Sequence, residues 1–409
     1  MLAEPKTGQA YRHMERGQNL ERQGRLDEAM LEFKHAIEAD PSIPSAHVAL
    51  GQHYRRKGLL TKAADELHTA ALLSADYASY FELGRILSEL ERYQDAQEAF
   101  QQCLSIDPDE PSARYELASV LYARGDFTQA LQQLQALAPD FPTDLELQTA
   151  IAECYLALRD YGAAESILAR ALDEAPPEDD REDLYEAWLV ARRHLEFDPQ
   201  PDLSVKDMLY AEQGILCLGT RHDNGLDIPV YENHTFTYGD IAATCRRLVA
   251  LQGGLRWPLR AVAAVDSSAL PLTIALSQLL QLPTEPLEAA GKGGLTLVIL
   301  AAVARPEIWQ VTRERMSGPV RSFGLALTWQ PDQGPVPDVV GLLCRGRCLM
   351  PWQRSPKPSP EAAAASILRA YAAQSGDDNV AAQIAYYKRH HSLLRFAGDV
   401  MIGAENRTV

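Results

Sequence analysis

The first 176 residues repeat one pattern of small, apolar and polar positions five times. A small residue marks each copy, an alanine follows twelve positions later, and a bulky apolar residue stands four positions after that alanine. The five triplets are Gly17, Ala29 and Phe33; Gly51, Ala63 and Leu67; Gly84, Ala96 and Phe100; Ala118, Ala130 and Leu134; and Ala152, Ala164 and Leu168. Successive copies lie 33 to 34 residues apart, so the pattern predicts a stack of similar units that bury their apolar faces against one another.

Each unit is predicted to contain two antiparallel helices, because small side chains on the first helix let the second approach closely. A proline closes four of the units, since proline cannot continue a helix. These prolines are Pro41, Pro108, Pro142 and Pro176, and the second unit lacks one. We place a tail at 1–9 and the units at 10–43, 44–76, 77–110, 111–144 and 145–178. A segment that begins acidic and ends basic follows, which suits a helix dipole and predicts a capping helix at 179–198.

After a linker at 199–207 the pattern changes to short runs of Val, Ile and Leu that alternate with amphipathic stretches. We expect strands at 213–219, 261–266, 295–301, 321–328 and 338–344, and helices at 239–251, 268–280 and 306–316. This alternation predicts an α/β domain at 208–353 with a mainly parallel sheet. A Pro-rich linker at 354–360 then precedes two amphipathic helices within 361–409, which either pack on this domain or mediate self-association. The predicted fold class is thus an all-α solenoid followed by an α/β domain and C-terminal helices.

Charge separates the two halves. Residues 1–200 hold 37 acidic and 19 basic side chains, a balance of -18, whereas residues 201–409 hold 19 and 20, a balance of +1. An acidic solenoid repels nucleic acid and anionic membranes, because phosphate contacts need clustered Lys and Arg. We therefore expect no nucleic-acid partner.

Targeting signals are also not predicted. The N-terminal residues lack the apolar segment of a signal peptide, and no apolar run reaches the roughly 18–20 residues of a membrane helix. Six scattered cysteines fit reduced thiols. We expect a cytoplasmic protein without membrane insertion.

The repeated pattern resembles the tetratricopeptide repeat family, from residue 10 to about residue 197. The resemblance implies a right-handed superhelix whose concave wall is made by the first helix of each unit and holds a peptide or a partner's helix. The family's pocket positions are the second, fifth, ninth and twelfth of each unit. Here they are Tyr11, Met14, Gln18, Glu21, Ser45, Val48, Gln52, Arg55, Ala78, Phe81, Arg85, Ser88, Ser112, Tyr115, Ser119, Tyr122, Glu146, Thr149 and Glu153.

The centre of this expected groove combines two arginines with aromatic side chains. We select as groove residues Gln52, Arg55, Phe81, Arg85, Tyr115 and Tyr122. Aromatic and arginine side chains are common interface anchors, and the set suits a ligand with an acidic residue beside an apolar one. The alternative interpretation is an ordinary exposed surface. The Lys and Asn set with which chaperone-binding members hold a C-terminal carboxylate is missing, so a chaperone tail is not expected as the ligand.

The order of elements in 212–350 resembles a type I phosphoribosyltransferase core. AAVDSSALPLTIALSQLLQLP is similar to the family's first strand, loop and helix, LTLVILAAVARPE lies where its phosphoribosyl-pyrophosphate loop would fall, and PDVVGLLCRG resembles a late strand. The family's paired acidic residues appear as Ala301 and Ala302, and its phosphate-binding Thr-Gly appears as Arg305 and Pro306. The resemblance therefore implies a catalytically degenerate relative, with an unrelated α/β domain as the alternative.

One predicted junction carries groups that suit a ligand. Asp266, Ser267 and Ser268 lie between a strand and a helix, where backbone N–H groups and the helix dipole favour an anion. The alternative is that one of the serines caps the helix. The second junction, loop 301–305, offers small side chains and one arginine.

Other motifs predict no chemistry. Cys344 and Cys348 form CRGRC without the second pair that zinc needs. GKGG at 291–294 is too short for a phosphate-binding loop. His390 and His391 are adjacent on a predicted helix and point apart, and the other histidines show no catalytic grouping. We expect no catalytic residues, no metal and no cofactor.

The sequence thus predicts a non-enzymatic adaptor whose repeats bind a protein or peptide and whose α/β domain adds a second interaction or ligand site. The alternative is an enzyme or sensor that acts on a phosphorylated sugar or nucleotide through Asp266, Ser267 and Ser268. A third hypothesis is that the two halves bind each other, with the C-terminal helices in the groove.

Overall fold

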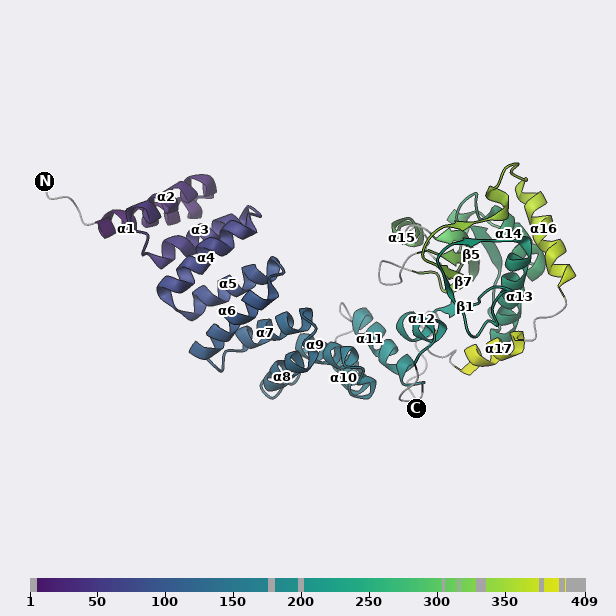
Figure 1. Cartoon of the computed structure of the whole chain (residues 1–409), viewed down its shortest axis with the longest axis horizontal. Helices are drawn as coiled ribbons and strands as arrows, with labels where there is room; N and C mark the ends of the chain where they lie inside the picture. The colour runs from purple at the N-terminus through teal and green to yellow at the C-terminus, as the bar shows by residue number, and fades with distance from the viewer. Residues whose placement is uncertain are drawn as a thin grey trace. The chain divides into compact units, whose positions relative to one another are not determined.

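The computed structural model describes residues 6–175, 181–197, 202–303, 306–314, 316, 318–328, 336–374, 379–389 and 394. The predicted fold class is confirmed, because a helical repeat region precedes an α/β region with a parallel sheet and C-terminal helices (Figure 1). The chain divides into two compact units, residues 1–188 and 189–409, which are described separately. The predicted positions Pro176, Arg305, His390 and His391 lie outside the described residues.

The helices of the first unit follow one another as antiparallel pairs, each with a helix A and a helix B. The pairs are α1 (Lys6–Arg22) with α2 (Leu26–Ala39), α3 (Pro44–Arg56) with α4 (Leu60–Ser74), α5 (Tyr77–Glu89) with α6 (Tyr93–Ile106), α7 (Pro111–Ala123) with α8 (Phe127–Leu137), and α9 (Leu145–Ala157) with α10 (Tyr161–Glu174). The pairs match the five predicted units.

A contact between a small and a bulky residue sets the distance between the helices of each pair. A Cβ atom added to Gly51 would lie 2.8 Å from Leu67 Cγ, and one added to Gly84 would lie 2.7 Å from Phe100 Cε1. Both distances are shorter than carbon atoms tolerate, so helix B lies where only glycine leaves room. The bulky residue was predicted to fill space between units, and it also packs against the small residue of its own unit.

A second recurring contact uses the closing proline. The polar side chain six residues after each described closing proline lies within hydrogen-bonding distance of that proline's carbonyl oxygen. The pairs are His47 with Pro41, Arg114 with Pro108 and Gln148 with Pro142. His47 also contacts Glu66 on helix B, with 2.7 Å between Nδ1 and Oε2, and this hydrogen bond raises the pKa of His47. One polar side chain therefore ties helix A both to its own helix B and to the turn before it.

Helix α11 (Arg181–His194) covers the end of the fifth pair. Leu184 packs in one cluster with Ala152, Leu168 and Ala171, and Trp188 Nε1 donates to Glu165 Oε1 at 3.2 Å. The apolar face that a sixth pair would cover is therefore shielded by a single helix.

The second unit continues with α12 (Val205–Gln213), β1 (Leu216–Cys217), β2 (Val230–Tyr231), β3 (His234–Thr235), α13 (Tyr238–Leu255), β4 (Ala261–Ala264), α14 (Leu270–Leu280), the 3-10 turn η1 (Leu287–Ala289), β5 (Thr296–Val303), α15 (Pro306–Glu314), β6 (Val320–Leu327), β7 (Val339–Cys344), β8 (Cys348–Leu349), the 3-10 turn η3 (Pro351–Gln353), α16 (Pro360–Ala373) and α17 (Val380–Arg389). Every strand and helix predicted between 213 and 344 is present, and α12 begins inside the predicted linker. None of the helices in the described part of the chain is long and apolar enough to cross a membrane.

The main sheet is parallel, with the order β1-β7-β6-β5-β4, and β2 pairs with β7 beyond the end of β1. In register, Ile299 lies opposite Phe323, and Phe323 lies opposite Val339. Short strands β3 and β8 form a separate parallel pair. Because all strands of the main sheet run in one direction, their carboxyl ends lie along one edge, where ligands bind in such folds.

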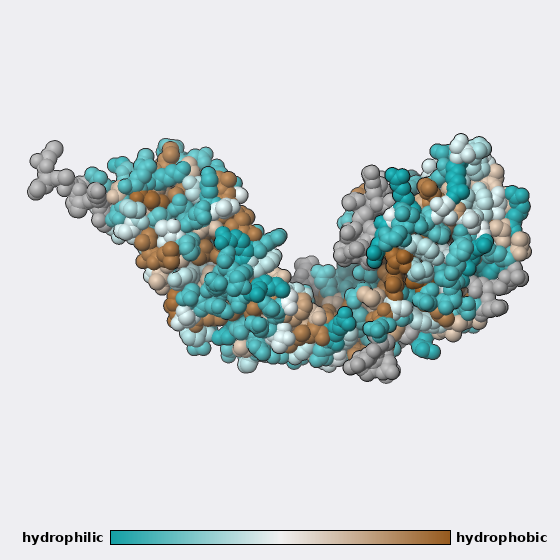
Figure 2. Space-filling model, viewed as in Figure 1, coloured by the Kyte–Doolittle hydropathy of each residue, from teal (hydrophilic) through white to brown (hydrophobic). Residues whose placement is uncertain are grey.

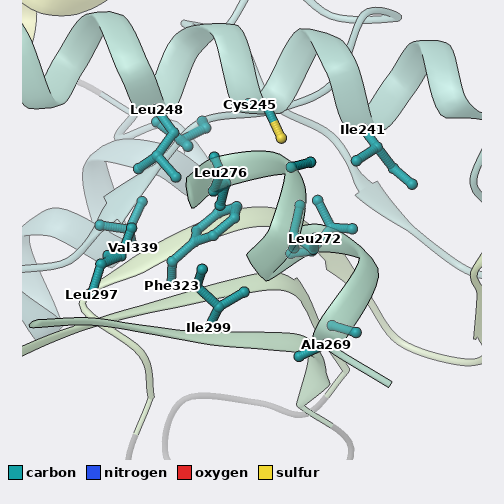
Figure 3. Packing of buried hydrophobic residues seen from close by; sticks show 14 of the residues in the cluster. Ile241, Cys245, Leu248, Ala269, Leu272, Leu276, Leu297, Ile299, Phe323 and Val339 are labelled. Carbon is teal, nitrogen blue, oxygen red and sulfur yellow. The ribbon is translucent and has the colours of Figure 1, made fainter. Parts of the chain in front are cut away.

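Helices cover both faces of this sheet. On one face, side chains of α13 and α14 meet those of the strands, as Leu248, Leu276 and Phe323 do in Figure 3, and α16 packs against the same two helices. On the other face, Leu209 of α12 and Trp309 of α15 share a cluster with strand residues. This double cover explains why the strands are continuous apolar runs.

The described C-terminal helices pack on the α/β unit. Tyr387 of α17 holds β1, since its hydroxyl lies 2.8 Å from both the backbone nitrogen and the carbonyl oxygen of Cys217. Gln383 Nε2 donates to the carbonyl oxygen of Leu218 at 2.9 Å. Of the two predicted alternatives, packing on the domain is therefore observed, and self-association stays a prediction.

The spacing contact gives the first testable prediction. Gly84→Ala should destabilise the repeat unit by about 1–3 kcal/mol, because the new methyl group collides with the ring of Phe100. The fourth pair has Ala118 and Leu134 at the corresponding positions. Gly84→Ala combined with Phe100→Leu rebuilds that pair and should cost less than the two single changes together. Urea unfolding of all four proteins, followed by circular dichroism, measures this coupling, and strictly additive costs would refute it.

Candidate functional site

The predicted groove residues lie on helices α3, α5 and α7, on a surface that we call the A-helix face. It comprises the exposed and half-buried pocket positions of α3, α5, α7 and α9. Gln52, Arg55, Phe81, Arg85 and Tyr115 are half-buried, and Tyr122 is 37 % exposed. The residues are thus accessible from one side and supported by the core from the other.

The two arginines of this face have different surroundings. Arg55 is neutralised by the next pair, because it donates to Glu89 and lies 3.8 Å from Glu82. Arg85 forms neither a hydrogen bond nor an ion pair with any residue that the structure describes. Only Arg85 of the predicted pair is therefore available to an anionic group of a ligand.

The aromatic side chains extend this surface in two directions. Phe81 stacks on Tyr77 at 5.6 Å and meets Phe100 edge to face at 5.8 Å, so it belongs partly to the core. Tyr115 lies on the next A helix and donates to Glu146 Oε1 at 3.2 Å. Burial and the charge of Glu146 raise the pKa of Tyr115 to about 12, so its hydroxyl remains a hydrogen-bond donor.

The face changes in charge along the array. Burial and the nearby Glu153 raise the pKa of Tyr122, whose ring packs against Phe127 at 5.2 Å. Glu146 and Glu153 are exposed on α9. The surface therefore runs from the free Arg85 on α5 to an acidic end on α9, and it suits an extended ligand of mixed charge.

A separate groove lies on another side of the third pair, and it was not predicted from the sequence. The α4–α6 groove has a volume of about 670 Å³, with a floor from α5. Its lining residues are Ala64, Asp65, His68, Thr69, Tyr80, Leu83, Leu87, Arg92, Asp95, Glu98, Ala99 and Gln102. Figure 2 shows hydrophobic patches interspersed with hydrophilic residues on the visible face of the repeats. The family's pocket positions do not include helix B, so the resemblance gave no signal for this groove.

In the α/β unit, the structure brings together four charged or titratable side chains near the carboxyl end of β1. This sheet-edge cluster consists of Arg221, His222, His234 and Asp240. No catalytic grouping of histidines was predicted, and the structure places two histidines near one buried carboxylate without testing that expectation. The only local signal is the Thr237-to-Asp240 spacing, which is that of a capping box at the start of a helix.

Asp240 is the centre of the sheet-edge cluster and is only 1 % exposed. Its Oδ2 accepts hydrogen bonds from the backbone and hydroxyl of Thr237 at 2.8 and 2.7 Å. Its Oδ1 lies 3.0 Å from Nε2 of the exposed His222 and 3.6 Å from Nε of Arg221. A buried carboxylate behind an accessible imidazole can orient that ring.

His234 lies on the buried side of the same carboxylate. Its ring sits 4.8 Å from that of Tyr231 and 4.6 Å from that of Phe236. Its Nε2 is buried without a hydrogen-bond partner and lies 3.9 Å from Asp240 Oδ2. Burial lowers the pKa of His234, although Asp240 opposes this effect.

The residues predicted at the first junction are placed together, at the start of α14. Asp266 Oδ1 accepts from the backbone nitrogens of Ser268 and Ala269 at 2.8 and 3.1 Å, and from the Ser268 hydroxyl at 2.6 Å. Trp352 Nε1 donates a hydrogen bond to the carbonyl oxygen of Ser268 at 2.9 Å. Ser267 is exposed. Asp266 thus uses the backbone nitrogens of Ser268 and Ala269 in the turn before α14, while α14 itself begins at Leu270 without a side-chain cap.

The second predicted junction lies partly in a strand. Ala301 and Ala302 belong to β5, and Ala302 pairs with Ala326 of β6, so the small-residue loop begins later than expected. Cys344 and Cys348 lie close together, and burial together with Cys344 raises the pKa of Cys348, which makes it a poor thiolate nucleophile. In the described part of this unit, no three metal-ligating side chains converge.

The environment of His234 predicts a pH effect. Because its pKa is lowered on folding, the unfolded chain takes up a proton near pH 6.5 before the folded chain does. The free energy of unfolding of the α/β unit should therefore fall between pH 7.5 and 5.5. His234→Phe keeps a ring between Tyr231 and Phe236 and should reduce this fall, whereas His222→Gln serves as the exposed control. Urea unfolding followed by tryptophan fluorescence measures the free energy of unfolding at each pH. An unchanged pH dependence in His234→Phe would show that His234 is not its source.

Comparisons with known proteins assign the repeat region. Residues 14–78, 87–154 and 147–182 match family models of the tetratricopeptide repeat. DnaJ homolog subfamily C member 3 of chicken (Gallus gallus) is 25 % identical over 160 residues, which cover 36 % of this chain and 32 % of that protein. This chain thus spans about a third of the length of that curated relative.

Solved structures of tetratricopeptide repeat proteins are also similar to part of this chain. YrrB, described as a tetratricopeptide repeat protein with an unusual peptide-binding site, is 22 % identical, with 43 % of this chain and 89 % of that chain covered and a TM-score of 0.40. The first repeat domain of Spaghetti (RPAP3), bound to an HSP90 peptide, is 23 % identical, with 29 % and 94 % covered and a TM-score of 0.27. The family matches lie within residues 14–182, so the resemblance of 212–350 to phosphoribosyltransferases stays a prediction. Residues from about 14 to 182 of this chain are tetratricopeptide repeats, a class of domain that binds peptides and proteins.

Proposed function

We propose that the chain is a non-enzymatic adaptor whose A-helix face binds a peptide or protein segment with an acidic residue beside an apolar one. The observation that carries this proposal is Arg85, which has no partner within the described part of the chain. Its guanidinium nitrogens are accessible to water, and a ligand carboxylate would replace this water with a charge-assisted pair of hydrogen bonds. Phe81, one turn before Arg85 on α5, provides the neighbouring apolar surface.

The charge gradient defines the direction of the ligand. A carboxylate at Arg85 is attractive, whereas one near Glu146 and Glu153 on α9 would be repelled. The ligand that fits best is therefore acidic where it crosses α5 and basic or hydrogen-bonding where it crosses α9. Tyr115 and Tyr122 lie between these ends and offer rings that can stack with arginine or apolar side chains.

The α/β unit serves in this proposal as a second interaction or ligand site and as a catalytically degenerate domain. The turn before α14 supports this role, since Asp266 occupies the backbone nitrogens of Ser268 and Ala269 and adds a negative charge where a phosphate would bind. We also propose a cytoplasmic location, which the six free cysteines support.

Peptide display on the full chain tests the groove. Selected peptides should be enriched in Asp or Glu beside a bulky apolar residue, and Arg85→Ala should weaken their binding by about tenfold or more in fluorescence polarisation. Arg92→Ala is the matched control. Arg92 belongs to the same repeat pair but lines the α4–α6 groove and is paired with Asp95 at 2.6 Å.

The two variants separate the two surfaces. Loss of binding in Arg85→Ala with retention in Arg92→Ala supports the A-helix face. The opposite result would move the binding site to the α4–α6 groove, and full binding by both variants would refute the role of Arg85.

A second candidate function, an enzyme or sensor for a phosphorylated sugar or nucleotide, is favoured by the sheet-edge cluster. Arg221 and His222 are exposed beside the buried Asp240 and could contact a phosphate and move a proton. Turnover of sugar phosphates or nucleotides by the full chain, abolished by His222→Ala, would establish this function in place of the degenerate domain. We expect no turnover from either protein.

A further inference from the structure

The first repeat carries a group of three side chains that metal ions use as ligands. His13 is on α1, and Glu32 and His35 are on α2, helices that lie side by side at the start of the array (Figure 1). One ligand atom from each residue lies within 4.8 Å of the other two. His13 Nδ1 and Glu32 Oε2 are only 2.7 Å apart, and the two imidazole rings meet edge to face at 5.4 Å. Among the described residues, no other three His, Cys or carboxylate side chains bring their ligand atoms this close together.

We propose that His13, Glu32 and His35 form a binding site for a divalent transition-metal ion, with Zn²⁺ as the best fit. Two imidazole nitrogens and one carboxylate oxygen are a ligand set that zinc uses, with water in the fourth position. Zinc bonds of about 2.0–2.2 Å place tetrahedral ligand atoms about 3.4 Å apart. His35 is exposed and the other two side chains are partly exposed, so small rotations about their side-chain bonds suffice to close the site.

The spacing on helix B makes this arrangement possible. Glu32 and His35 are three residues apart on α2 and share one side of the helix. His13 reaches the same point from α1 and already contacts Glu32. The metal would take the place of the shared hydrogen bond and join both helices, because its ligands come from each of them.

The second repeat contains the same pair without the third ligand. His47 and Glu66 occupy the positions of His13 and Glu32, 34 residues further on, and are also 2.7 Å apart. Thr69 stands where the first repeat has His35. The polar pair is therefore a general contact between helices A and B, and His35 is the addition that turns it into a metal site in the first repeat.

A metal here would stabilise the first helix pair. His13 lies on α1, and Glu32 and His35 lie on α2, so one ion would join the two helices. Binding to the folded pair and not to the unfolded chain stabilises the pair.

Calorimetric titration of the full chain with ZnCl₂ at pH 7.5 tests the site in three proteins. The unaltered chain should bind one Zn²⁺ equivalent at this site. His35→Thr gives the first repeat the residue of the second and should weaken this binding at least about tenfold. Thr69→His gives the second repeat all three ligands and should add one equivalent. Because imidazole must be neutral to bind, affinity should fall at pH 5.5.

Hydrogen exchange locates the effect within the chain. Zn²⁺ should slow backbone exchange in residues 6–39 of the unaltered chain and leave His35→Thr unchanged there. Equal isotherms for the unaltered chain and His35→Thr would overturn the proposal, because zinc would then bind through other histidines. Absence of a second equivalent in Thr69→His, with the helix content intact, would contradict the claim that these three positions suffice.

Discussion

The close approach of helix A to helix B is the contact on which the repeat half depends. In the first three pairs this approach leaves no space for even one methyl group on the small residue, as the distances at Gly17, Gly51 and Gly84 demonstrate. The same close packing fixes the rotation of helix A about its axis, and thereby decides which of its residues face the core. Phe81 and Arg85 reach the A-helix face because Leu83, Gly84 and Leu87 are held inside. The candidate binding surface is thus a consequence of the packing contact on the opposite side of the same helices.

Most of the fold could be predicted from the sequence because two periodicities dominate it. The 33-to-34-residue period locates the helix pairs, and the alternation of apolar runs with amphipathic stretches locates the parallel sheet. The short strands β2, β3 and β8 have two residues each, so no window of sequence is long enough to reveal their pattern. Helix α12 was not predicted, and its first residues fell within the expected linker, because its stabilising contacts are remote. Buried Lys206 donates to the carbonyl oxygen of Gly225 at 2.7 Å and lies over the rings of Tyr386 and Tyr387.

The candidate sites were less predictable, because they depend on which side chains find partners. Arg55 and Arg85 are the twelfth and ninth residues of their units and were both selected as groove residues, yet only the structure places Glu82 and Glu89 beside Arg55. In the same way, Asp266 was grouped with two serines as a ligand site, and its carboxylate accepts hydrogen bonds from the backbone of its own turn before α14. Pairing across helices or turns of a loop is decided by distances of a few ångströms, and residue spacing alone does not contain that information.

Histidines that lie near a carboxylate differ between the repeats and the sheet-edge cluster in whether the protonated ring is favoured. His47 and His13 each face a glutamate, and at His47 this contact favours the protonated ring. His234 is enclosed by aromatic rings and disfavours the proton, although Asp240 is near. The difference lies in whether the imidazole makes a hydrogen bond to its carboxylate, at 2.7 Å for His47, or is held beyond reach, at 3.9 Å for His234. Since Asp240 Oδ2 is already satisfied by Thr237, it cannot turn toward His234 without breaking the cap of α13. The helix cap therefore leaves Asp240 Oδ1 facing Arg221 and His222, the two side chains of the cluster that a ligand can reach.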